Sequence, residues 1–402
     1  MTTHKPSTAA KQEEPSVGIV SPNQVRLFQP PHVLKLANGA ALGPITIQYE
    51  TYGRLNAKKD NAILLCHALS GDAHAAGRHA PEDPAPGWWD TAVGPGKALD
   101  TDEYFILCAN VLGGCKGSTG ASSTDPATGR PYGLSFPIVT IGDMVECQKA
   151  LVDHLGIPKL LAVVGGSMGG MQALEWAVRF PEKIQAAIPV ATTYRLSAQG
   201  IAFNAVGREA IFADPNWKRG DYYGGEAPAS GLAIARMIGH ITYLSDKSMH
   251  EKFGRELRHR EEYAYNFETE FQVESYLRHQ GQKFIQRFDA NSYLYITKAM
   301  DYFDMTDNFP SLRASLKRTR AKFLLLAFSS DWLFPPQEMR DIAGALRANG
   351  ADVTYLEIKS DYGHDAFLLE TEEVTRAMKP FLRYLHRGGH GAHRGAAEGG
   401  VL

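Results

Sequence analysis

The sequence is poor in cysteine and has no excess of charge of either sign. Its 402 residues include four cysteines, 42 lysines and arginines, and 44 aspartates and glutamates, for a formal net charge of −2. Because a domain that binds nucleic acid normally carries a basic excess, this balance argues against a nucleic-acid partner. No two cysteines form a Cys-x-x-Cys pair, so their spacing supports neither a zinc cage nor a redox motif. We expect all four thiols to be structural or incidental.

Long apolar runs are also missing. No stretch of about 18 apolar residues is present, so the sequence predicts no membrane-spanning helix. Residues 1–16 are polar and acidic, without the apolar run of a secretory signal, which favours a cytoplasmic protein. These residues and the Gly/Ala/His-rich residues 387–402 have little to bury, and we expect both segments to be disordered tails.

Motifs that bind phosphate or metal are lacking as well. The Gly-rich residues 111–124 do not have the G-x-x-x-x-G-K-[ST] spacing of a nucleotide-phosphate loop. His74 and His79 show no partner pattern that supports a metal site, and the histidines of the C-terminal tail would bind metal only adventitiously. We therefore expect no metal and no bound cofactor.

Strand-like and helical patterns alternate along much of the chain. Residues 45–51 alternate apolar and polar side chains at period two, as a half-exposed strand does. A helical stripe of apolar residues covers 141–155. Short apolar runs predict further strands at 62–68, 104–109, 160–164, 183–191, 323–328 and 353–358. Strand, helix and strand in succession predict a mostly parallel sheet with right-handed crossovers.

Residues 195–310 have a different pattern, with many charges, few strand-like runs and long helical stretches at 230–246 and 268–287. The strand pattern returns after residue 310, with a helix predicted around 338–349. We therefore predict one α/β domain, built from residues 17–194 and 311–386, into which 195–310 are inserted as helices.

The sharpest local motif is GGSMGG at residues 165–170, which fits G-x-S-x-G around Ser167. It follows a predicted strand and precedes a helical run at 171–179, which is the context of a serine nucleophile on a strained strand-to-helix turn. Flanking glycines let the neighbouring backbone approach closely, and the helix N-terminus favours developing negative charge. Ser167 is the predicted nucleophile; the alternative is a Gly-rich turn without chemistry.

A serine nucleophile needs a base, and the base needs a carboxylate to orient it. On this kind of strand–turn–helix site the chain order is Ser, then Asp or Glu, then His. Asp331 and His364 follow two predicted strands, so both lie at strand carboxyl ends, where open α/β sheets place their sites. Asp361 and Asp365 compete for the acid role, but they adjoin the histidine in sequence, so Asp331 is better placed.

Acyl transfer also needs two backbone amides that hold the oxyanion. One is expected at Met168, directly after the nucleophile. The other is expected at Leu69, in the loop 66–71 that follows the strand-like residues 62–65. In the same loop, His67 is interpreted as a turn-forming residue rather than a second base.

Nine segments of the sequence, taken in order, resemble one known family. They are PPHVLKLANG, HALSGDAHAAG, PGWWD, NVLGGCKGSTGASS, PYGLSFP, GGSMGGMQALEW, ARMIGHITY, SSDWLFPP and GHDAFLLE. Together they resemble the homoserine O-acyltransferases of the α/β-hydrolase superfamily, of the acetyltransferase type, over about residues 25–386. The resemblance implies an α/β-hydrolase fold with a helical lid and a triad of Ser167, Asp331 and His364.

The resemblance also implies substrates and a mechanism. Arg236 is expected to bind the carboxylate of L-homoserine, and Asp365 its ammonium group. Acetyl-CoA is the expected co-substrate in a ping-pong reaction of L-methionine biosynthesis, with no metal or bound cofactor. The implied partners are these small molecules, with no nucleic acid and no membrane, and a second copy of the chain in a homodimer formed through the lid.

Leu333 occupies the position, two after the triad aspartate, that this family associates with acyl choice. A leucine offers no cation to the free carboxylate of a succinyl group, so acetyl is favoured. Succinyl-CoA stays open because an arginine elsewhere in the lid could supply the charge, and serine could replace homoserine as acceptor. A serine esterase and a catalytically silent binding protein are the more distant alternatives.

Overall fold

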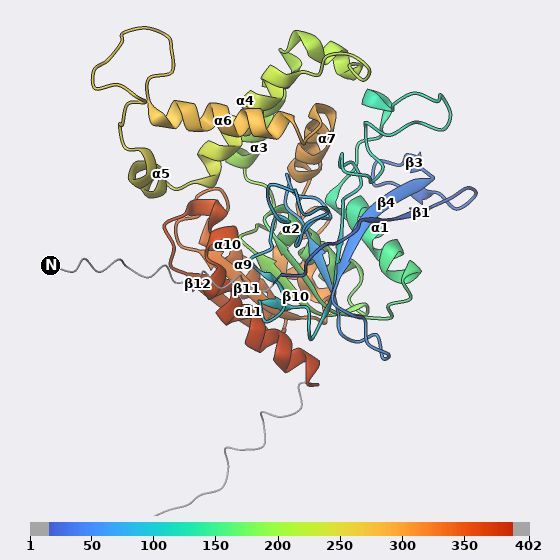
Figure 1. Ribbon diagram of the computed structural model, residues 1–402. Coiled ribbons are helices and arrows are strands. Elements are labelled where there is room, and N and C mark those ends of the chain that lie inside the picture. Colours follow the sequence, from blue (N-terminus) through green and yellow to red (C-terminus); the bar gives the residue numbers. More distant parts are fainter. Residues whose placement is uncertain (1–15, 389–402) are drawn as a thin grey trace, which may run out of the picture.

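Eight strands form the central sheet, in the order β1-β4-β8-β5-β9-β10-β11-β12 (Figure 1). The computed structural model describes residues 16–388, so the predicted tails lie almost wholly outside the described residues. The strands are β1 (Asn23–Leu27), β4 (Ile45–Tyr52), β5 (Ala62–Cys66), β8 (Phe105–Ala109), β9 (Leu160–Gly166), β10 (Ile184–Val190), β11 (Lys322–Phe328) and β12 (Val353–Ile358). The β1–β4 and β4–β8 pairs are antiparallel and the other pairs are parallel, which confirms the mostly parallel sheet.

The central strands are buried on both faces, as their continuous apolar runs predict. In β5, Leu64 and Cys66 face one hydrophobic core, whereas Ile63 and Leu65 face the other. The first core lies under α1 (Ile141–His154), α2 (Met168–Arg179) and α9 (Pro336–Ala348), and the second under α11 (Thr371–His386). The sheet is therefore the middle of three layers.

The helices between β10 and β11 gather on one side of the sheet, at the top of Figure 1. These cap helices are α3 (Ala198–Phe212), α4 (Ala229–Tyr243), α5 (Asp246–Phe253), α6 (Gln272–Ile285) and α7 (Ala290–Asp301). Where the cap leaves the sheet and returns to it, the two chain segments pair as a stem. The amide of Leu196 donates to the Phe303 carbonyl (3.0 Å), and the amide of Met305 donates to the Tyr194 carbonyl (2.9 Å).

Some predicted element boundaries are wrong. Residues 230–246 are not one helix, because the backbone turns extended at Leu244 and the Ser245 side chain caps a new helix, α5. The helix expected over 268–287 begins only at Gln272, where Glu274 accepts the amide of Phe271. The sequence also did not predict β1, or the two short paired ribbons β2–β3 (Leu34–Lys35, Ala41–Leu42) and β6–β7 (Val93–Gly94, Leu99–Asp100).

Remaining helical turns are short, and they connect the sheet to the larger helices. They are α8 (Leu312–Ser315), α10 (Ala366–Leu369) and the 3₁₀ turns Gly133–Ser135, Pro215–Gly220, Leu316–Arg318 and Gly363–Asp365. No helix within residues 16–388 has the length and apolarity needed to cross a membrane.

Candidate active site

Ser167 lies on a sharp turn between β9 and α2. Its backbone angles, φ 58° and ψ −123°, are strained for a residue with a side chain, at a cost of about 1–3 kcal/mol. The turn is held by the Ser167 amide, which donates to the Val190 carbonyl at 2.9 Å. A Cβ atom on Gly169 would lie 2.1 Å from the Cys66 carbonyl oxygen, so only glycine lets α2 approach β5 this closely. The motif therefore forms the strand–turn–helix structure that its sequence predicts.

The serine, the histidine and the aspartate are joined by hydrogen bonds. Ser167 Oγ lies 2.8 Å from His364 Nε2, and His364 Nδ1 lies 2.8 Å from Asp331 Oδ2. The other oxygen of Asp331 accepts the backbone amides of Leu333 (3.0 Å) and Phe334 (2.9 Å). With its proton on Nδ1, His364 is oriented to accept the serine proton at Nε2.

The surroundings of His364 set its proton affinity. Burial of the ring by itself lowers the pKa, but the charge and the hydrogen bond of Asp331 outweigh it, with a further contribution from Asp365. The pKa of His364 is therefore raised above its ordinary value. Three aromatic rings surround the imidazole, with centroid distances of 5.0 Å to Phe334, 5.7 Å to Phe367 and 5.9 Å to Tyr243.

The two predicted oxyanion amides border the nucleophile. Met168 is the first residue of α2, and Leu69 lines the same pocket as Ser167. Within residues 16–388, neither amide has a hydrogen-bond acceptor. Both N–H groups are therefore available to an oxyanion on a substrate.

Arg236 and Asp365 lie next to this triad without pairing to each other. Arg236 donates from Nη1 to Ser70 Oγ at 3.3 Å, and its guanidinium stacks over Phe284 at 4.8 Å. It makes no ion pair with any carboxylate in the part of the chain that the structure describes. Burial raises the pKa of Asp365, while the charges of His364 and Arg236 act to lower it. Burial has the larger effect, so the pKa of Asp365 is raised above its ordinary value. Like Arg236, Asp365 forms no ion pair within residues 16–388.

A cavity of about 50 Å³ connects the nucleophile to the cap. Its lining comprises residues of α3, α4 and α7 together with Leu69, Ser167, Leu196, Leu333 and Phe334. No lysine or arginine lines this pocket among the described residues. Leu333 therefore lies beside the nucleophile, at the wall of an apolar cavity.

Comparisons with known proteins agree with this architecture. A family model described as the alpha/beta hydrolase fold matches residues 61–371. A homoserine O-acetyltransferase of Methanohalobium evestigatum is 59% identical over 363 residues, covering 90% of this chain and 74% of the relative. The chain belongs to the homoserine O-acetyltransferase family.

Solved structures show how widely this architecture is shared. The crystal structure of homoserine O-acetyltransferase from Bacillus anthracis matches with a TM-score of 0.83 and 31% identity, over 90% of this chain and 98% of that one. The crystal structure of esterase E22 matches equally well, with a TM-score of 0.83 and 31% identity, over 90% and 100% of the two chains. The backbone alone therefore does not separate acyl transfer to homoserine from ester hydrolysis in this family.

Several residues of the site were not predicted from the sequence. Tyr243 lies two helical turns after Arg236 on α4, a spacing that places both on one helix face and could have indicated it. Arg287, whose Nη1 donates to the Ser70 carbonyl at 2.8 Å, had no such pattern. Its guanidinium stacks on the Phe284 ring at 5.3 Å. Arg287 therefore adds a second cation to the site, beside Arg236.

His67 and the cysteines have structural roles in this member of the family. His67 Nε2 accepts the Val111 amide (3.1 Å), and its Nδ1 therefore donates to the Ala68 carbonyl (2.8 Å). Both ring nitrogens are thus occupied, as expected for a residue that shapes the turn. All four cysteines are free, and only Cys115 is partly exposed.

Proposed function

We propose that the protein transfers the acetyl group of acetyl-CoA to the hydroxyl of L-homoserine, a step of L-methionine biosynthesis. The observation that carries this proposal is the continuous hydrogen-bonded chain from Ser167 through His364 to Asp331, beside an unpaired Arg236. The 59% identity to a homoserine O-acetyltransferase supports the same acceptor.

Acylation of the serine would come first. His364 Nε2 accepts the proton of Ser167 as its oxygen attacks the thioester carbonyl. The amides of Leu69 and Met168 hold the oxyanion. When the carbon–sulfur bond breaks, the departing CoA sulfur takes the proton from His364, and Ser167 is left acetylated.

Transfer to the acceptor would follow through the same groups. Arg236 binds the carboxylate of homoserine and Asp365 its ammonium group, which brings the side-chain hydroxyl to the acetylated Ser167. His364 takes the hydroxyl proton, the new ester bond forms, and the proton returns to Ser167 Oγ as the acyl-enzyme bond breaks. No metal or bound cofactor takes part in this mechanism.

The cap helices would act as a lid that keeps water from the acyl-enzyme. The pocket beside Ser167 is shared between the cap and the sheet loops, which supports this role. Its apolar lining next to Leu333 supports acetyl over succinyl, because no lysine or arginine lines this pocket to pair with a second carboxylate.

A serine esterase is the second candidate, because the esterase E22 structure matches as well as a transferase does. Arg236 and Asp365 favour transfer, since simple ester hydrolysis does not require one group that binds an amino-acid carboxylate and another that binds its ammonium group. Succinyl-CoA as donor and serine as acceptor are the closer alternatives.

The test is release of CoA thiol from acetyl-CoA and from succinyl-CoA, each with and without L-homoserine. We expect release from acetyl-CoA that depends on homoserine and disappears in Ser167→Ala. Arg236→Ala should lower homoserine transfer by about a hundredfold, the loss of a bidentate charged contact, while hydrolysis of p-nitrophenyl acetate persists. Arg376→Ala, an exposed arginine on α11, is the matched control and should change neither rate.

Each other outcome selects an alternative. CoA release that ignores homoserine would support the esterase, and a preference for succinyl-CoA would overturn the interpretation of Leu333. Transfer to L-serine at an equal rate would broaden the acceptor.

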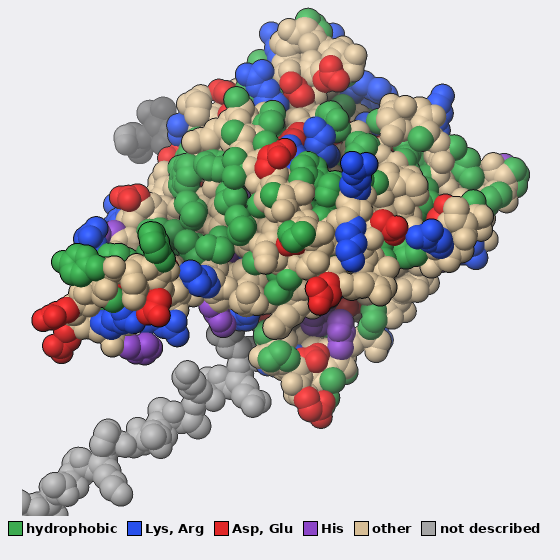
Figure 2. All heavy atoms as spheres, turned by 90° about the horizontal axis from the view of Figure 1, so that it is seen from above, with side chains coloured by type: hydrophobic (Ala, Val, Ile, Leu, Met, Phe, Trp, Pro, Cys, Tyr) green, Lys and Arg blue, Asp and Glu red, His purple; other side chains and the backbone are tan. Residues whose placement is uncertain are grey.

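We further propose that two copies of the chain form a homodimer through the cap in the cytoplasm. Hydrophobic side chains gather on part of the face seen in Figure 2. On the cap helices, Val206 of α3 and Ile234 of α4 are 56% and 47% exposed. Four free cysteines support a reducing compartment.

A further inference from the structure

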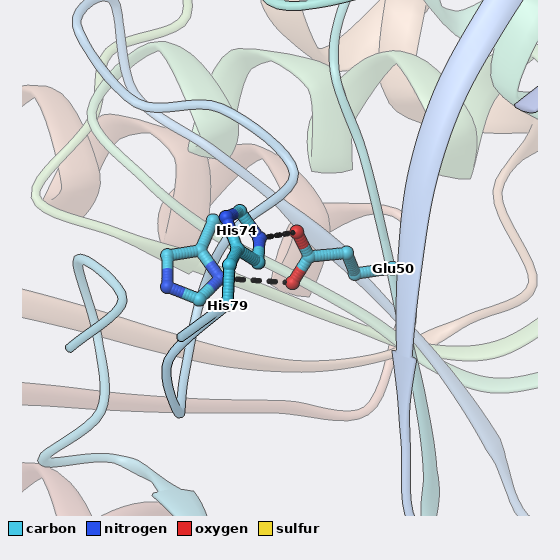
Figure 3. Close-up of side chains that lie close together, drawn as sticks. All are labelled: Glu50, His74 and His79. Carbon is cyan, nitrogen blue, oxygen red and sulfur yellow. Dashed lines mark hydrogen bonds and ion pairs between the residues drawn. The ribbon is translucent and has the colours of Figure 1, made fainter. Parts of the chain in front are cut away.

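Glu50, His74 and His79 form a compact cluster that the mechanism above does not use (Figure 3). Glu50 lies in β4, and both histidines lie in the loop that follows β5. Within residues 16–388, no hydrogen bond joins the three side chains to Ser167, Asp331 or His364. The partner of the two histidines is not evident from the sequence, because Glu50 is 24 and 29 residues away from them.

The ligand-type atoms of the cluster converge. His74 Nδ1 lies 3.0 Å from Glu50 Oε2, and His79 Nε2 lies 2.7 Å from Glu50 Oε1. One nitrogen or oxygen of each residue lies within 4.8 Å of the others. Zinc bonds of about 2.0–2.2 Å place tetrahedral ligand atoms about 3.3 Å apart, so relative side-chain movements of up to about 1.5 Å would bring these atoms, which lie within 4.8 Å of one another, to zinc distances.

The surrounding charge favours a cation. Both oxygens of Glu50 contact imidazole nitrogens, of His74 and of His79, and Oε2 also accepts the Tyr52 hydroxyl at 2.8 Å. Two more acids, Asp72 and Asp83, adjoin the histidines and accept their backbone amides at 2.9 and 2.8 Å. Three carboxylates thus surround two imidazoles.

One side of the cluster is closed and the other is open. His74 Nε2, which is not the ring nitrogen that contacts Glu50, is buried and has no hydrogen-bond partner among the described residues. Glu50 is 1% exposed and closes one side, whereas His79 is 42% exposed and leaves the other side open to solvent. An entering ion would therefore find three protein ligands and room for water.

We propose that Glu50, His74 and His79 bind a divalent transition-metal ion of the zinc class, with water completing its coordination. Two imidazoles and one carboxylate are a ligand set that zinc commonly takes in proteins. The Tyr52 hydroxyl, 2.8 Å from Glu50 Oε2, would hold that ligand in place from behind. The bound ion would fasten β4 to the loop that carries the Leu69 amide, five residues before His74.

The test uses the full-length chain without an affinity tag, stripped with a chelator and dialysed against Zn²⁺. We expect a single bound ion per chain by elemental analysis, and a rise in Tm of about 2 °C or more at saturating Zn²⁺. Co²⁺ should show the visible absorption of a site with nitrogen ligands. The bound Zn²⁺, the rise in Tm and the Co²⁺ absorption should all be lost in His79→Ala. The His79 side chain is half-exposed, so it can be removed without opening the core.

The histidines of the C-terminal tail supply the matched control. His390→Ala combined with His393→Ala removes two imidazoles from the chain, and binding should be unchanged. Glu50→Gln, which keeps the size of the side chain, should lower Zn²⁺ affinity at least about tenfold. Zinc binding that is lost with the tail histidines, or retained in His79→Ala, would overturn the site. So would a wild-type chain that binds no Zn²⁺.

Discussion

His364 is held at both ring nitrogens, by Asp331 on one side and by Ser167 on the other. The backbone amides of Leu333 and Phe334 fix the orientation of Asp331 in turn. Because Ser167, Asp331 and His364 are all buried, the orientation of the imidazole depends on a few fixed dipoles rather than on solvent. The effect of each contact can be measured through the titration of the histidine.

Acyl transfer should lose rate on the acid side of a pKa that lies above 6.5. The neutral form of His364 accepts the serine proton, and Asp331 raises the pKa of His364 above its ordinary value of 6.5 despite burial. As the pH falls through the raised pKa, the ring becomes protonated and kcat/KM declines. Homoserine-dependent CoA release measured from pH 5 to 9 gives this profile.

Asp331→Asn should move the acid limb to lower pH and reduce the rate at pH 8 by about a thousandfold, because the charge that orients the ring is gone. Asp361→Asn is the matched control: Asp361 is exposed, pairs with Lys247, and should leave the limb in place. A wild-type midpoint below pH 6.5 would contradict the inferred influence of Asp331.

How far the site follows from the sequence depends on the residue. Ser167, Asp331 and His364 are predictable because a local motif marks the first, and strand ends in a fixed chain order mark the others. Arg287 and Glu50 are not, since each gains its role only when distant segments meet. The alternating pattern of residues 45–51 places Glu50 on the polar face of a half-exposed strand. In the structure, however, Glu50 is buried against a loop that follows it in the sequence.

At the scale of elements, the turn between β9 and α2 depends on close backbone contact. Gly169 lies against the Cys66 carbonyl, and Gly165 lies against the backbone of Gly169. A side chain at either position would push α2 away from the sheet, and the helix N-terminus would move with it. The amide of Met168 would then no longer meet an oxyanion formed at Ser167.

Gly169→Ala should therefore lower both stability and activity. We expect a loss of about 2 kcal/mol in the free energy of unfolding, because the new methyl group overpacks against backbone that cannot yield. Gly344→Ala in α9 is the matched control, since no atom lies within 4 Å of its added Cβ. It should stabilise the protein by about 0.5–1 kcal/mol, as alanine favours helix. Urea unfolding measures both, and equal effects at the two glycines would contradict the argument.

At the scale of the whole molecule, the strands are the most predictable part. Residues 353–358 and 45–51 were placed nearly to the residue, because continuous or alternating apolar patterns mark them. The break between α4 and α5 was missed, since Leu244 is apolar and continues the helical pattern while the cap at Ser245 ends it. The short β2–β3 and β6–β7 ribbons have too few residues to show any period.

The proposed homodimer should dissociate when charge is placed on the exposed apolar surface of the cap. Val206→Glu combined with Ile234→Glu would bury two carboxylates at the interface, so we expect a monomer by sedimentation velocity. Ile19→Glu is the matched control, because Ile19 has the same 56% exposure as Val206 but lies outside the cap. A wild-type chain that sediments as a monomer would overturn the dimer.

Because the two segments that connect the cap to the sheet are paired, the cap could be replaced by another set of helices at this point. Tyr194 and Leu196 bond to the chain at Met305 and Phe303, so the segment leaves and rejoins the core at a single point. Replacing everything above the stem would change the cap side of the pocket and remove Arg236, while Asp365, Leu333 and the strand order of the sheet stay in place. Evolution can thus vary the chemistry of the acceptor without refolding the catalytic core, and a protein engineer can cut at the same place.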